Sequence, residues 1–139
     1  MLSVAADGGR PPLTVPVWYA YEPGGNVTFF TGTQGRPARK TRLIERSRVL
    51  SLCVQQAEYP YMFVTVEGTV VDIDRAPAAD RISAIAGRYL PEELARGLAD
   101  AEVEQRSDTF VLFTVRPDRW IALDFAADDE RDDPESPSA

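Results

Sequence analysis

Short runs of strand-forming residues, each bounded by turn residues, dominate this sequence and restrict the folds that it can adopt. Residues 13–21 alternate between apolar and other side chains, and residues 27–31, 49–55 and 61–73 are rich in β-branched and aromatic residues. Runs of this kind predict β-strands. The turn-forming residues 22–26 join the first two runs as a hairpin. We therefore expect a mainly β protein.

Proline and glycine refine this pattern at three places. Pro16 cannot donate a ladder hydrogen bond, so its run is expected at a sheet edge or at a strand start. Gly68 predicts a bend or bulge within its strand. Pro117-Asp118 predicts the turn of a last hairpin between residues 109–116 and 120–124. So many short strands would expose many edges, and closure removes edges, so we expect a closed antiparallel barrel.

Three segments carry helical patterns. Pro37 to Arg48 begins with a proline that suits a first helical turn. Ala76 to Leu90 follows Asp74, a capping residue, and places apolar residues on one face. Pro91 opens a third helix whose acidic first turn is favoured by the helix dipole. Helices are few beside the strands, so the expected class stays mainly β.

Length and composition predict one folded domain with a tail. A chain of 139 residues, 44% of them hydrophobic, can bury one core. Residues 127–139 are acidic and rich in proline and serine, so we expect a disordered tail there. Residues 1–126 are then a single domain. Met1 to Ala6 resembles the end of a strand that begins further upstream.

Composition also limits the location of the protein. No apolar run approaches the roughly 20 residues that span a bilayer. The first residues lack the basic start and apolar stretch of a signal peptide. Cys53 is the only cysteine and cannot form an internal disulfide, which fits a reducing cytoplasm. We therefore expect a cytoplasmic protein with no membrane partner.

The chain contains no histidine. This excludes histidine-based catalytic triads, histidine general bases and histidine metal sites. The acidic tail lacks the spacing of a calcium loop, so no metal site is expected. If the protein is an enzyme, a bound organic cofactor is expected to supply the hard chemistry.

Positive charge is concentrated in one short segment of an acidic protein. The net charge is −7, yet residues 36–48 hold six bases and one acid, hence +5. Residues 128–135 hold six acids and one base, hence −5. A local anionic ligand explains this distribution better than a general attraction to nucleic acid. No aromatic ladder interleaves the bases, so no nucleic-acid partner is expected.

Residues 29–40 combine the features of a phosphate site. A strand ends in Thr31-Gly32-Thr33, and a helix carrying Arg39 and Lys40 follows. The free N–H groups at a helix start favour a phosphate. The threonine hydroxyls can donate hydrogen bonds, and the two bases can add charge-assisted ones. The alternative is a turn followed by a solvated basic helix face.

The order of several short motifs resembles a known family. These motifs are Phe30-Thr31, Ala38-Arg39-Lys40, the apolar strand Val49 to Val54, and Val66-Glu67-Gly68. In this order they look like the core of the pyridoxamine 5′-phosphate oxidase-like split barrels. The stretches TVPVWYAY before them and RPDRWIALDF after them resemble actinobacterial variants, many of which use the deazaflavin coenzyme F420. The resemblance implies an antiparallel Greek-key split β-barrel.

The resemblance also implies a homodimer with two cofactor sites at the subunit interface. Trp120 would approach the cofactor from the other subunit. The contacts that the resemblance implies within one chain are Pro16, Val17 and Trp18 behind the ring system, Thr31, Gly32 and Thr33 at the ribityl-phosphate end, and Arg39 and Lys40 at the phosphate.

The sequence departs from true pyridoxamine phosphate oxidases at three places. The Arg and Lys of one of their strands are absent from Val15 to Ala20, and Phe63 replaces their Gln. Their C-terminal Arg-Leu-His motif is also missing. Pyridoxamine phosphate oxidation is therefore not expected, and F420 is preferred to FMN as cofactor.

These departures favour a reductase in which reduced F420 passes a hydride to an unsaturated organic substrate. Two alternatives stay open: an FMN-binding oxidoreductase of the same fold, and a non-catalytic module that sequesters a flavin. No catalytic residue is assigned. The candidates for a proton donor are Tyr19, Tyr21, Tyr59 and Tyr61.

Overall fold

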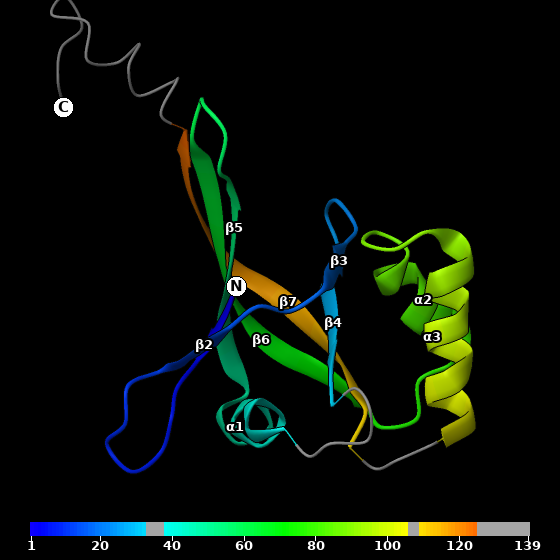
Figure 1. Ribbon diagram of the computed structural model, residues 1–139. Coiled ribbons are helices and arrows are strands. Elements are labelled where there is room, and N and C mark those ends of the chain that lie inside the picture. Colours follow the sequence, from blue (N-terminus) through cyan, green and yellow to red (C-terminus); the bar gives the residue numbers. More distant parts are fainter. Residues whose placement is uncertain (33–37, 106–108, 125–139) are drawn as a thin grey trace, which may run out of the picture.

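The computed structural model describes residues 1–32, 38–105 and 109–124, which form one curled antiparallel sheet and three helices (Figure 1). The strands are β1 (Leu2–Val4), β2 (Leu13–Val15), β3 (Tyr19–Tyr21), β4 (Val27–Thr31), β5 (Val49–Gln56), β6 (Met62–Asp74) and β7 (Val111–Asp124). The helices are α1 (Arg39–Ser47), α2 (Ala79–Ala86) and α3 (Glu92–Gln105). The expected tail, residues 127–139, lies outside the described residues. None of the described helices is long and apolar enough to cross a membrane.

The sheet is a split barrel with two free ends. Its strand order is β2-β1-β5-β6-β7-β4-β3, so β2 and β3 are neighbours in sequence but lie at opposite ends of the sheet. Residues 16–18 carry the chain from one end to the other (Figure 1). The mainly β split barrel is confirmed. Full closure was the wrong expectation, because strand pairing in the described part of the chain stops at these two edges.

The predicted closing hairpin is also wrong, because β7 is one continuous strand. Its pairing with β6 changes register at Gly68, which lies opposite Pro117 while Glu67 lies opposite Arg119. Asp118 is the extra residue of this bulge, so the bend expected at Gly68 is confirmed. The pairing of β7 with β4 ends at Val115, so Pro117 lies at the bulge and past the end of that pairing. A strand proline is tolerated at a bulge and beside a free edge.

Two apolar clusters lie on opposite faces of the sheet, as the alternation of β4 requires. Phe29 belongs to the cluster inside the curled sheet, where Leu43 and Ile44 of α1 also lie. Phe30, its neighbour in sequence, belongs to the cluster beneath α2 and α3. Phe113 and Leu112 of β7 alternate in the same way.

The three predicted helices are present with shorter bounds. α1 begins at Arg39 and α2 ends at Ala86, whereas α3 begins at Glu92, directly after the predicted Pro91. α2 and α3 pack as a pair beside β3 and β4 (Figure 1). α3 and the end of β4 contribute to the lining of the hollow described next.

Candidate cofactor site

A hollow of about 360 Å³ opens where the link between β2 and β3, the end of β4, the start of α1 and the side of α3 meet. Its volume lies within the roughly 300–1,000 Å³ that is typical of small-molecule sites. Six of the nine predicted cofactor contacts line it, together with Phe30 and Leu98: Pro16, Val17, Trp18, Thr31, Gly32 and Lys40. We call this hollow the β4–α1 pocket.

One end of the β4–α1 pocket is polar and tightly built. Thr31 is the last residue of β4, and its buried hydroxyl lies 2.5 Å from the hydroxyl of Thr41 in the first turn of α1. Gly32 follows with a φ of +80°, and a Cβ there would lie 1.6 Å from the carbonyl oxygen of Thr109. A glycine is therefore required where the chain leaves β4.

The start of α1 places a positive charge beside these groups, with no counter-ion among the described residues. Ala38 caps the helix without a side-chain hydrogen bond, so α1 gains no capping acceptor there. Burial lowers the pKa of the Lys40 ammonium. No described residue forms an ion pair with Lys40. A helix start beside an unpaired cation is the electrostatic environment that an anion prefers.

Arg39 is half-buried and adds a second unpaired group. Its Nη2 atom is buried and has no hydrogen-bond partner in the part of the chain that the structure describes. A buried guanidinium nitrogen without a partner is costly, and an anionic oxygen would satisfy it. Arg39 is not among the residues that line the β4–α1 pocket.

The other bases of α1 are already paired. Arg42 and Arg46 both contact Asp7 Oδ2, at 2.7 Å and 3.1 Å. The hydrogen bond from Arg42 is the main cause that holds the pKa of Asp7 below its ordinary value. The bases of α1 thus divide into two pairs, and among the described residues Arg39 and Lys40 are the pair without a carboxylate partner.

The rest of the lining of the β4–α1 pocket is mostly apolar and includes two aromatic rings. Trp18 is 36% exposed. Its indole stacks on the Tyr89 ring with a centroid distance of 5.1 Å and an interplanar angle of 8°, and it meets the edge of Phe30 at 6.3 Å. Leu98 of α3 completes the wall. The arrangement can accept both a flat apolar ring and an anionic group.

The two remaining predicted contacts are Thr33 and Trp120. Thr33 falls outside the described residues. Trp120 lies on β7 beside Tyr21, with ring centroids 5.4 Å apart, and lines a separate apolar hollow of about 100 Å³. One chain therefore does not bring Trp120 to the β4–α1 pocket, and its expected approach from a second subunit stays a prediction.

Sequence reasoning missed Leu98 of α3, which lines the β4–α1 pocket, and Tyr89 of the turn after α2, which stacks on Trp18. No local pattern distinguishes a leucine that lines a pocket from one that fills a core. Phe30 stood inside the quoted motif but was not assigned to the site.

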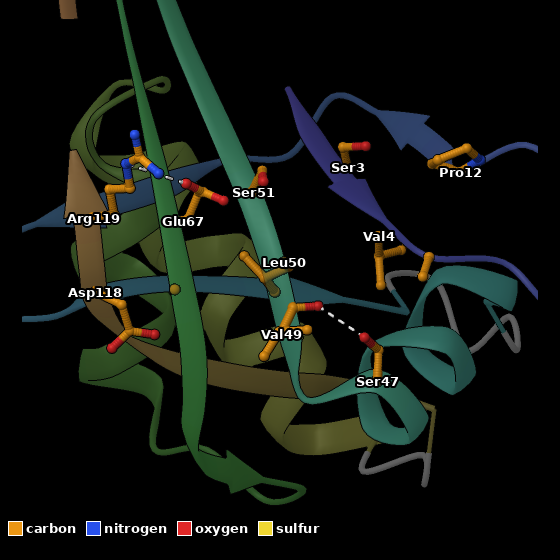
Figure 2. Close-up of a pocket in the computed structure, with 12 residues that line it drawn as sticks. Ser3, Val4, Pro12, Ser47, Val49, Leu50, Ser51, Glu67, Asp118 and Arg119 are labelled. Carbon is orange, nitrogen blue, oxygen red and sulfur yellow. Dashed lines mark hydrogen bonds and ion pairs between the residues drawn. The ribbon is translucent and has the colours of Figure 1, made fainter. Parts of the chain in front are cut away.

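A larger hollow of about 590 Å³ lies on the surface formed by β1, β5, β6 and β7 (Figure 2). Its charged side chains already have protein partners. Glu67 lies 3.8 Å from Arg119, and Asp118 accepts hydrogen bonds from Thr69 and Arg116. No aromatic ring lines it. Larger volume alone does not make it a better cofactor site than the β4–α1 pocket.

No family model and no curated protein matches the chain. Solved structures do match it. An F420 reductase is 21% identical with a TM-score of 0.62, and 86% of each chain is covered. A putative pyridoxamine 5′-phosphate oxidase from Listeria innocua is 14% identical with a TM-score of 0.58, covering 88% of this chain and 85% of that one. An FAD-binding protein from Mesorhizobium loti is 20% identical with a TM-score of 0.51, covering 87% and 79%. The chain has the split-barrel fold that these proteins share.

Proposed function

We propose that this chain, built on the pyridoxamine 5′-phosphate oxidase-like split barrel, is a flavin- or deazaflavin-dependent oxidoreductase. The observation that carries the proposal is the lining of the β4–α1 pocket, which combines Lys40, a cation that no described residue pairs, with the exposed indole of Trp18. Phosphorylated flavins and deazaflavins have this same pattern of a flat ring system joined to an anion. The names of two structural neighbours, F420 reductase and FAD-binding protein, support the same cofactor class.

The residues of the pocket fit both parts of such a cofactor. Lys40 and the start of α1 would hold the phosphate. Trp18 and Leu98 would enclose the ring system and exclude water from it. The bound cofactor would supply hydride transfer, and the chain would bind it, orient it and keep water away from its ring.

Coenzyme F420 is our first choice, and an unsaturated organic compound is the substrate class. Val15 to Ala20 contains no basic side chain, so the ring end of the pocket lacks the cations with which related oxidases hold FMN. FMN is the second candidate for the same site. A flavin-binding module without turnover is the remaining alternative, because no described side chain of the pocket is assigned as a proton donor.

We further propose that the working form is a homodimer in which Trp120 of one copy reaches the site of the other. The far part of β5, β6 and β7 projects from the rest of the fold (Figure 1). Exposed apolar side chains lie along these strands: Met62 at the start of β6, and Trp120 and Ile121 on β7, with Trp120 beside Tyr21 of β3. A second copy covering this arm would bury them.

The test is a titration of the purified chain with F420 and, separately, with FMN, followed by absorbance and fluorescence. We expect F420 to bind more tightly than FMN. We also expect the complex with reduced F420 to transfer a hydride to at least one member of a panel of unsaturated acceptors. Tighter binding of FMN would select the second candidate. Binding without reduction of any acceptor would favour the sequestering module, and binding of neither cofactor would refute the proposal.

A further inference from the structure

We propose that Tyr89 is a positioning residue, which fixes the Trp18 indole as the wall on which the ring of the bound ligand rests. The inference rests on the proposed function for the identity of that ligand. Its structural basis is the contact between the turn after α2 and the segment that leads into β3. This turn lies far from Trp18 in the sequence, and no motif in it predicted a role at the site.

Tyr89 covers one face of Trp18. The two rings are nearly parallel, with an interplanar angle of 8° and centroids 5.1 Å apart. Phe30 meets the same indole edge-on at 76°. The indole is thus supported by two rings, and 36% of Trp18 is left exposed beside the β4–α1 pocket. Stacked and edge-to-face pairs of this kind favour one ring orientation over others.

The Tyr89 ring is itself held in place through its hydroxyl and through Arg88. The backbone N–H of Tyr19 donates to the Tyr89 hydroxyl at 3.1 Å. Arg88 donates to the carbonyl oxygen of Tyr19, and its guanidinium lies 4.5 Å from the centroid of the Tyr19 ring. These contacts connect the turn at 88–89 to one residue of β3, the residue that directly follows Trp18.

The position of β3 explains why these contacts form. β3 is the last strand of the sheet, so its outer N–H and C=O groups lack a neighbouring strand. An uncovered edge is a liability that proteins cover with side chains or loops. Arg88 and Tyr89 satisfy the outer groups of Tyr19, and the same turn places an aromatic ring against Trp18. The same turn therefore both covers the edge of the sheet and orients the indole.

A fixed indole favours binding because less side-chain conformational entropy is lost when the ligand binds. A tryptophan that samples several rotamers must lose that freedom when a ring stacks on it. Tyr89 restricts the indole before the ligand arrives. Leu98, which also lines the pocket, belongs to the same helical pair, so the unit from α2 to α3 affects both the orientation of Trp18 and the room left for the ring.

The experiment uses the full chain with Trp120→Phe, so that Trp18 is the only tryptophan. Tyr89→Leu removes the ring, and Tyr89→Phe removes only the hydroxyl. The matched control is Leu94→Ala, at an exposed residue of α3 outside the pocket. The readouts are acrylamide quenching of Trp18 fluorescence without ligand, the dissociation constants for F420 and FMN, and the thermal midpoint.

We expect Tyr89→Leu to increase quenching and to weaken binding of the preferred cofactor by roughly 2- to 10-fold, the range of one aromatic pair. Tyr89→Phe should bind within about 2-fold of the parent chain, since the stack stays, although it loses the edge-covering hydroxyl. Affinity should thus be kept in the variant that keeps the ring and be lost in the variant that lacks it. If the role of Tyr89 were only structural, affinity would instead change in step with the thermal midpoint in both variants.

Unchanged quenching and affinity in a folded Tyr89→Leu variant would overturn the inference, as would equal losses in Tyr89→Phe and Tyr89→Leu. Should Tyr89→Leu fail to fold, Tyr89→Met replaces it with a longer flexible side chain. If the unsubstituted chain, which keeps both tryptophans, binds neither cofactor, the proposed function fails, and the quenching comparison alone still decides whether Tyr89 orients Trp18.

Discussion

Lys40 is the side chain on which the proposed phosphate site depends most. Replacing Lys40 with Ala removes one charge-assisted hydrogen bond, which contributes roughly 1.5–3 kcal/mol. We therefore expect the preferred cofactor to bind about one to two orders of magnitude more weakly, in a variant that still folds. Isothermal titration or fluorescence titration measures the change.

Arg46→Ala is the matched control for Lys40→Ala. Arg46 is on the same helix, but it contacts Asp7 and does not line the β4–α1 pocket. Arg42 also binds Asp7, at 2.7 Å, so the Asp7 loop stays attached when Arg46 is lost. Equal losses of affinity in both variants, abolished by moderate salt, would indicate a diffuse basic patch in place of a site.

Lys40 also predicts how binding depends on pH. Burial lowers its pKa below the ordinary 10.5, and a bound anion would raise it again by favouring the charged form. Affinity should therefore be constant at neutral pH and fall as the pH rises through the lowered pKa, before an ordinary lysine titrates. Titrations at a series of alkaline pH values test this.

Lys40→Arg is the comparison that isolates the lysine, because arginine stays protonated throughout this range. Ionisation of the cofactor affects both proteins equally. The Lys40→Arg variant should lose less affinity than the parent chain as the pH rises. Identical pH profiles in the two proteins would show that another group causes the loss.

At the scale of elements, the junction between β4 and α1 tolerates no side chain at Gly32. Its φ is +80°, and a Cβ would collide with the backbone of Thr109. We expect Gly32→Ala to destabilise the fold by more than about 1 kcal/mol. Gly97 of α3 is the control, since a Cβ there meets nothing within 4 Å.

Gly97→Ala should raise the free energy of unfolding by roughly 0.5–1 kcal/mol, because alanine favours a helix interior over glycine. Urea unfolding followed by circular dichroism measures both variants. A neutral Gly32→Ala variant would mean that the close approach of β4 to Thr109 is relaxed in solution, and the polar end of the pocket would then be less rigid than described.

At the scale of the whole molecule, the proposed shared site requires a stable dimer. Light scattering should give about twice the 15.4 kDa mass of one chain. Trp120→Ala should weaken cofactor binding if the indole reaches the site of a second copy, although Trp120 lies outside the β4–α1 pocket of its own chain. A monomer that binds cofactor with unchanged affinity would contradict the shared site.

Local patterns in the sequence determined most of the elements. Alternation predicted the strands, since neighbours such as Phe29 and Phe30 must face opposite sides of a sheet. The Thr31-Gly32 strand end and the basic start of α1 predicted one polar end for a site, because both belong to one continuous segment. These inferences needed only contacts between residues close in sequence.

Tertiary structure decided what depends on distant partners. A Pro-Asp pair suits either a hairpin turn or a bulge, and only the pairing of β7 with β6 selected the bulge at Asp118. Tyr89 and Leu98 join Trp18 because α2 and α3 pack beside β3 and β4. Likewise, β2 and β3 separate because their hydrogen-bonding partners, β1 and β4, belong to opposite ends of the sheet. Pairing and packing across the chain, rather than local preference, created the pocket.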